Sequence, residues 1–227
     1  MQAAEKDDEG AAKLSPEEVR DNAVAFLFAG SETTATSTCW TLFHLTHNPE
    51  AYKKLQAEVD AAMAGDTVAD VEELERMPYL AQCFKESMRL SHPGFATSLK
   101  TLKVETQLGN HKVPAGVNVQ VDTGLVHMNP RVYPEPAKYN PERWDVSEGG
   151  EEGKTGLNSW AYLPLGAGTR HCIGKNFAYQ EAHIMLAMIV KRYDWTLAEG
   201  QPAEVLQEFK PPLLPPAGGV RFAFASR

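Results

Sequence analysis

The sequence of 227 residues is poor in cysteine, has no excess of basic residues and lacks a long apolar run. Three cysteines are too few, and odd in number, for a disulfide framework, which indicates free thiols in a reducing compartment. No stretch approaches the roughly 18 consecutive apolar residues of a membrane-spanning helix, and the acidic N-terminus MQAAEKDDEGAAK is unlike a signal peptide. A net charge of −8 argues against a nucleic-acid-binding protein.

Helical patterns dominate the chain, whose hydrophobic fraction of 43% is that of an ordinary globular protein. Ser15, Pro16 and Glu18 form the signature of a capping box, which predicts a helix that continues until Pro49. Further helices are predicted over residues 48–65, 79–91 and 173–192.

A smaller β-prone portion covers residues 97–105 and 117–121 and the tail VRFAFAS. Four prolines between residues 128 and 144 predict irregular but ordered structure, and GGEEGKTG (149–156) predicts a flexible insertion. Residues 1–14 are predicted to be a disordered lead-in, and residues 15–227 a single folded portion. The sequence therefore predicts a mainly α fold with a small β portion.

One loop, LPLGAGTRHCIGKNFAYQE, places a cysteine directly before a helix. Gly166 and Gly168 give this loop backbone freedom that residues with a Cβ lack. The free N–H groups of Ile173 and Gly174 are expected to point back toward the sulfur of Cys172. Because a thiol at a helix N-terminus is acidified, Cys172 is a candidate metal ligand, whereas Cys39 and Cys83 have the pattern of buried core residues.

Other uses of the loop fit its spacing less well. Five residues separate Gly168 from Gly174, one more than in a P-loop, and the third glycine of a Rossmann fingerprint is missing. Structural zinc needs companion ligands at short spacing, which the scattered histidines do not supply. A catalytic cysteine with a distant histidine and an axial thiolate to a haem iron remain open.

PLGAGTRHCIG resembles the haem-binding signature of the cytochrome P450 family, F-G-x-G-x-R-x-C-x-G. The matching residues are Gly166, Gly168, Arg170, Cys172 and Gly174. The resemblance implies that Cys172 is the axial ligand of haem b and that the three glycines and Arg170 shape the cofactor site. Leu165 stands where the family usually has phenylalanine.

AGSETT, residues 29–34, resembles the distal helix motif of the same family, A-G-x-[DE]-T-T. Gly30 and the hydroxyl of Thr33 are expected to open the hydrogen-bond ladder of the helix and leave a groove for O2. The resemblance places Ala29 and Gly30 against the cofactor. Glu32 and Thr33 are the candidate catalytic residues, an acid and an alcohol that relay protons.

KESMRL and PERW supply Glu86, Arg89 and Arg143, which in the family form a buried structural network. Trp144 replaces the usual phenylalanine, an exchange of one aromatic residue for another. Haem propionates need cations, and the resemblance proposes Arg170, His127 and Lys100 for this role.

The resemblance runs from about Leu14 to the C-terminus and implies the C-terminal part of the cytochrome P450 fold, from the distal helix onward. It implies a haem-thiolate monooxygenase that uses O2, a small apolar substrate and an electron-donor reductase. A membrane anchor, if the parent has one, lies upstream, and the resemblance leaves the parent's compartment open between the endoplasmic-reticulum membrane and the cytoplasm. A truncated, non-catalytic haem-binding fragment is the alternative. The intact GSETT argues against a third option, a member of the family that rearranges peroxides.

Overall fold

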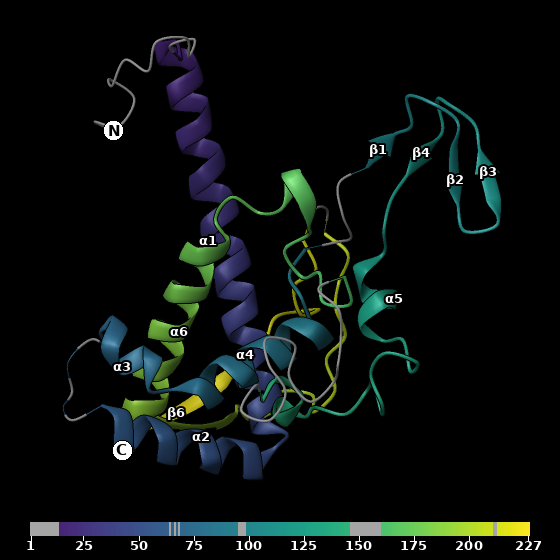
Figure 1. The fold of residues 1–227 in the computed structure, drawn as a ribbon. Coiled ribbons are helices and arrows are strands. Elements are labelled where there is room, and N and C mark those ends of the chain that lie inside the picture. The colour runs from purple at the N-terminus through teal and green to yellow at the C-terminus, as the bar shows by residue number, and fades with distance from the viewer. Residues whose placement is uncertain are drawn as a thin grey trace.

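The computed structural model describes residues 14–63, 65, 67, 69–94, 99–145, 160–210 and 213–227. The predicted lead-in, apart from Leu14, and the predicted insertion at 149–156 lie outside the described residues. The long helix α1 (Pro16–Thr46) extends away from the other elements at its N-terminal end, and α6 (Lys175–Arg192) lies beside it (Figure 1).

Helix α1 begins with the predicted capping box and spans 31 residues. Ser15 Oγ accepts a hydrogen bond from the Glu18 backbone N–H, and a Glu18 carboxylate oxygen accepts one from the Ser15 N–H. The many hydroxyls of α1 are compatible with a helix because several donate to the carbonyl four residues earlier, as Ser37 does to Thr33 at 2.8 Å. The first half of α1 is largely exposed, and burial begins at Thr34.

The core lies where α2 (Pro49–Ala62), α4 (Pro78–Leu90) and α6 pack against the second half of α1. Its centre consists of fully buried aliphatic and small side chains, among them Leu45, Leu55, Leu80, Cys83 and Leu186. Proline at the first helical position starts α1, α2 and α4, because a missing N–H costs nothing there. The sequence predicted that α2 ends at residue 65 and that α6 begins at residue 173. In the structure α2 ends at Ala62 and α6 begins at Lys175. A short helix, α3 (Val71–Glu75), precedes α4.

Among the described residues, the β portion consists of three two-stranded antiparallel sheets. They pair β1 (Lys100–Thr101) with β4 (Asn118–Val119), β2 (Thr106–Leu108) with β3 (His111–Val113), and β5 (Tyr193–Leu197) with β6 (Phe222–Ser226). The sheet of β5 and β6 is hydrogen-bonded to α1. The Trp195 indole N–H of β5 donates to Leu42 O and to Thr46 Oγ1 at 3.3 and 3.0 Å.

The predicted irregular region, residues 128–144, follows directly after the short helix α5 (Thr123–His127) and ends in a 3-10 helix over Pro141–Trp144. The mainly α fold with a small β portion is confirmed. Within the residues that the structure describes, no helix has both the length and the apolar character needed to cross a bilayer.

Candidate active site

The cysteine loop is closed by its own backbone. The Cys172 N–H donates to Leu165 O at 2.9 Å. Gly166 and Gly168 have φ values of 70° and 71°, in the left-handed region that residues with a Cβ rarely adopt. Gly174 lies against the sulfur, since a Cβ built there would be 3.9 Å from Cys172 Sγ. The sequence therefore forms a tight turn that presents a half-buried thiol at the start of α6.

The other two thiols occupy different surroundings. Cys39 lies in α1 and Cys83 in α4, where Cys83 is fully buried. Burial raises the pKa of both thiols above its ordinary value and so disfavours their thiolate forms. Among the three cysteines, Cys172 is the candidate metal ligand.

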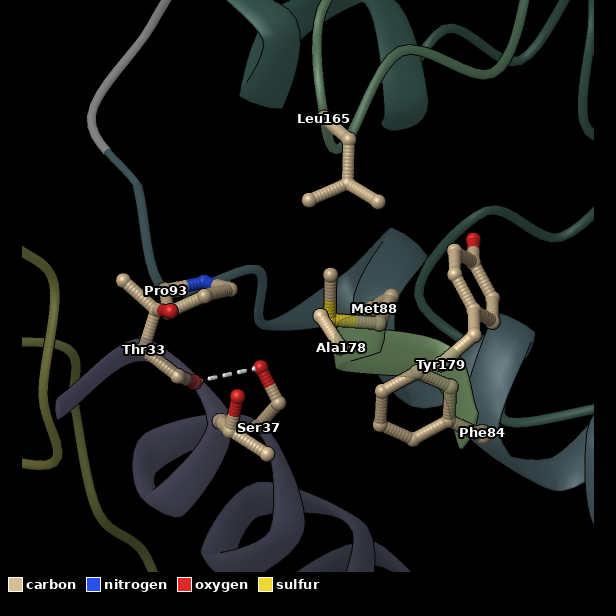
Figure 2. A pocket seen from close by; sticks show the side chains of 9 residues that line it. Thr33, Ser37, Phe84, Met88, Pro93, Leu165, Ala178 and Tyr179 are labelled. Carbon is tan, nitrogen blue, oxygen red and sulfur yellow. Dashed lines mark hydrogen bonds between the residues drawn. The ribbon is translucent and has the colours of Figure 1, made fainter. Parts of the chain in front are cut away.

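A small cavity joins the cysteine loop to α1 (Figure 2). Its volume is about 20 Å³. Thr33, Thr34 and Ser37 of α1 line it, and the other lining includes Phe84, Met88, Leu165 and Ala178. In Figure 2, Leu165 points from the loop toward the side chains of α4, with Thr33 and Ser37 on the neighbouring helix. Two motifs far apart in the sequence thus meet at one place.

The AGSETT segment lies in the exposed half of α1. Ala29 and Glu32 are exposed, and a Cβ added to Gly30 would meet nothing within 4 Å. Thr33 Oγ1 donates to Ala29 O at 2.7 Å. Helix α1 continues without interruption through this segment, so the predicted opening of its hydrogen-bond ladder is not observed. The Thr33 hydroxyl adds a bond to the Ala29 carbonyl while the helix persists.

A buried network of hydrogen bonds joins Glu86, Arg89 and Arg143. The Arg89 guanidinium donates from Nε and Nη2 to the two carboxylate oxygens of Glu86, at 2.9 and 2.8 Å. Arg143 Nε donates to Glu86 Oε1 at 3.2 Å. Such a paired arrangement is required because an unpaired buried charge is strongly destabilising.

Trp144 is a member of this network that sequence reasoning missed. Its indole N–H donates to Glu86 Oε2 at 3.0 Å. The tryptophan therefore supplies a hydrogen-bond donor that the family's usual phenylalanine lacks. The available signal was the indole N–H itself, which needs a partner when it is buried.

The three proposed propionate cations differ in their surroundings. His127 is fully buried, and its Nε2 accepts a hydrogen bond from the Leu163 backbone N–H at 2.9 Å. Burial, with His92 and Arg89 nearby, lowers the pKa of His127 to about 3. The contact of His127 with a propionate stays a prediction: the neutral ring would offer Nδ1, which is buried and has no hydrogen-bond partner among the described residues.

Lys100 and Arg170 are exposed, and neither forms an ion pair with another described residue. Lys100 belongs to β1, and Arg170 ends the 3-10 helix Gly168–Arg170 just before the cysteine. Both cations are therefore available to an anionic group.

Comparison with known proteins gives a consistent result. The family model for cytochrome P450 matches residues 1–220. The mitochondrial 1,25-dihydroxyvitamin D(3) 24-hydroxylase of Rattus norvegicus is 34% identical over 193 residues, which cover 85% of this chain and 36% of that protein. The cytochrome P450 monooxygenase FUS8 of Gibberella fujikuroi is 38% identical, over 86% of this chain and 38% of its own length.

Among solved structures, the retinoic-acid-bound cyanobacterial CYP120A1 matches 99% of this chain and 49% of its own, with a TM-score of 0.87 and 28% identity. The chain thus spans between 36% and 49% of the length of these three relatives. Because the family model covers almost all of its residues and the cysteine loop has the geometry described above, the chain belongs to the cytochrome P450 family.

Proposed function

We propose that this chain forms the haem-thiolate portion of a monooxygenase that inserts one oxygen atom of O2 into a small apolar organic substrate, with electrons from a separate reductase. The observation that carries the proposal is the shared cavity, because it places Thr33 of α1 and Leu165 of the cysteine loop around one space.

The residues of the cysteine loop fit a haem. Among the described residues, no three histidine, cysteine, aspartate or glutamate side chains gather to enclose a metal. A lone thiol therefore suits a metal that brings its other ligands with it, as haem iron does. Cys172 would hold the iron through its sulfur, and the left-handed backbone at Gly166 and Gly168 would keep the loop in its tight turn. Gly174 lies beside Sγ, and the thiol is half-buried.

Two further parts of the chain would complete the binding of haem b. Gly30 leaves open space on α1, where a flat macrocycle can approach beside Ala29. The exposed cations Lys100 and Arg170 are the candidates to pair with the propionates. When bound, haem with a thiolate ligand supplies the chemistry that cleaves the O–O bond.

The chain's own contribution to the reaction is the movement of protons. Glu32 is exposed on α1 and can exchange protons with solvent. The Thr33 hydroxyl next to it donates to Ala29 O, so its oxygen lone pairs can accept a further hydrogen bond. We infer that this pair relays protons toward the oxygen that is reduced.

An apolar substrate is supported by apolar side chains of α1 and of the C-terminal tail. Phe26 is 58% exposed, and Leu213 and Leu214 are half-buried in the tail. Such surfaces recognise hydrocarbon rather than charge. The relatives agree, since retinoic acid and dihydroxyvitamin D are themselves largely hydrocarbon.

A non-catalytic haem-binding fragment is the second candidate. The observation in its favour is the exposure of large apolar side chains on α1, because a site left open to water at this face excludes solvent poorly. They are Val24, Phe26, Leu27 and Phe28, exposed by 54 to 75%. Product formation with an added reductase separates the two candidates, since only the enzyme consumes a substrate.

The first test is the carbon-monoxide difference spectrum of the reduced, haem-reconstituted chain. Thiolate ligation predicts a strongly red-shifted Soret band that is lost in Cys172→Ser and kept in the control Cys39→Ser. An unchanged band in Cys172→Ser would show that another group holds the iron. A chain without any such band would show that these residues do not assemble the site on their own.

A further inference from the structure

Met128 is an exposed methionine whose sulfur faces a buried cation. The residue is 40% exposed, and its Sδ lies 4.0 Å from Arg89 Nη1. At this distance the thioether is a weak acceptor for the guanidinium N–H. One side of the sulfur is thus open to solvent while the other side contacts a charged donor.

Both partners of this contact are held in place. Arg89 is 1% exposed, and its Nη1 also donates to His127 O and Pro136 O at 2.9 and 2.7 Å. The backbone of Met128 follows α5, where its N–H donates to Gly124 O at 3.0 Å. The sulfur and the guanidinium therefore stay close while the fold persists.

The buried charges around this contact favour a stronger acceptor than sulfur. One carboxylate, that of Glu86, pairs with two guanidinium groups, those of Arg89 and Arg143. Among the described residues, Arg89 Nη1 contacts two carbonyl oxygens and the sulfur, and no carboxylate. Because hydrogen bonds from a charged donor are about twice as strong as neutral ones, an oxygen attached to the sulfur would be stabilised here.

The distance from the sulfur to the nitrogen leaves room for such an oxygen. A charge-assisted hydrogen bond between nitrogen and oxygen spans about 2.7–2.9 Å. The 4.0 Å between Met128 Sδ and Arg89 Nη1 is longer than this. An oxygen bonded to the side of the sulfur that faces Nη1 therefore reaches hydrogen-bond distance, in a bent arrangement, while both side chains keep their positions.

Exposure separates Met128 from the methionines of the core. Methionine oxidation converts an apolar side chain into a polar one, and it requires that the oxidant reach the sulfur. Met63, Met77 and Met88 are only 1 to 3% exposed. Met185 of α6 is 38% exposed, and among the described residues its sulfur has no counterpart to the contact between Met128 and Arg89.

We propose that Met128 is a modification site for hydrogen peroxide and related peroxides, and that its sulfoxide accepts a hydrogen bond from Arg89. The sulfur gives an electron pair to one peroxide oxygen and bonds to it, and the O–O bond breaks. The second oxygen takes both protons and leaves as water, so the sulfur is oxidised by two electrons and the peroxide is reduced. The new bond ties the end of α5 to α4. It needs no haem and does not rest on the proposed function.

Two variants isolate the exposed sulfurs. Met185→Leu leaves Met128 as the exposed methionine of the described residues, and Met128→Leu leaves Met185, each by an exchange of similar volume. Both haem-free chains are treated in the folded state with hydrogen peroxide, and peptide mass mapping locates the added oxygen. We expect the oxygen on Met128 in Met185→Leu. An unmodified Met128 under conditions that oxidise Met185 in the other variant would overturn the proposal.

Urea unfolding of the same samples tests the hydrogen bond. Oxidation of Met128 in Met185→Leu should lower the equilibrium constant of unfolding at least about threefold, because the sulfoxide gains a charged donor in the folded chain. Oxidation of Met185 in Met128→Leu is the matched control and should not lower it. An equal or higher constant after oxidation of Met128 would overturn the assignment of Arg89 as the donor.

A crystal structure of the oxidised Met185→Leu chain gives a readout independent of stability. The expected result is a sulfoxide oxygen within hydrogen-bond distance of Arg89 Nη1. A sulfoxide oxygen that faces solvent would overturn the proposal, whatever the urea midpoint. If the carbon-monoxide band is absent while the oxygen lies on Arg89, the proposed function fails and the inference on Met128 stands.

Discussion

Trp144→Phe should destabilise this chain even though phenylalanine is the residue that the family usually has at this position. Glu86 Oε1 accepts hydrogen bonds from Arg89, Arg143 and the Asn140 backbone N–H. Within the described part of the chain, the donors to Oε2 are Arg89 Nε and Trp144 Nε1. Loss of the indole N–H leaves one side of Oε2 without a donor in a site where the Glu86 side chain is fully buried.

The magnitude follows from the charge of the acceptor. A hydrogen bond to a charged group is worth about 1.5–3 kcal/mol, against about 0.5–1.5 kcal/mol for a neutral one. Trp195→Phe is the matched control, because the buried Trp195 donates its indole N–H to the neutral acceptors Leu42 O and Thr46 Oγ1. Trp144→Phe should therefore lower the free energy of unfolding by about 1 kcal/mol more than Trp195→Phe does.

Urea unfolding followed by circular dichroism measures this difference. With a slope of about 3 kcal/mol per M of urea, a loss of about 2–3 kcal/mol in Trp144→Phe lowers the midpoint by about 0.7–1 M, and a smaller slope gives a larger shift. An equal effect of the two substitutions, or a gain of stability in Trp144→Phe, would refute the assignment of the indole as a donor to the carboxylate.

Three further predictions concern other parts of the chain. Burial lowers the pKa values of His44 and His127 to about 3 and of His183 to about 4. These histidines stay neutral in the folded chain, whereas in the unfolded chain they take up protons below their ordinary pKa of about 6.5. The free energy of unfolding should therefore fall as pH drops from 7 toward 4, by about 1.4 kcal/mol per pH unit for each histidine. Urea midpoints at several pH values check this, and a flat profile would contradict it. Thr33→Ala should keep the carbon-monoxide band but lower the product formed per O2 at least about tenfold, as simultaneous assays of O2 and product would show; full coupling in this variant would exclude the hydroxyl from the relay. Gly166→Ala should lower the free energy of unfolding by about 1–2 kcal/mol because φ is positive there, and an unchanged urea midpoint would contradict this.

Local signals in the sequence predicted those features that depend on neighbouring residues. The capping box at Ser15 and Glu18 predicted the start of α1. Gly166 and Gly168 predicted a turn with backbone angles that residues with a Cβ rarely adopt. Such features could be predicted because their partners lie within a few residues.

Features that depend on distant partners could not be derived in this way. The contact between Trp144 and Glu86 joins residues 58 positions apart, so the composition of either segment does not reveal it. His127 carries the motif of a cationic contact, yet burial makes the ring neutral, and burial is a property of the whole fold. The meeting of Thr33 with Leu165 at one cavity follows from no spacing in the sequence.

The two environments of α1 also divide its amides into two kinetic classes. One continuous helix of 31 residues is mostly exposed before Thr34 and mostly buried from Thr34 onward. Amide hydrogens in the exposed half exchange with solvent whenever that end of the helix frays, whereas those near Leu45 exchange only when the core opens. The boundary between fast and slow exchange should therefore fall inside a single helix, within one turn of the threonines that line the cavity.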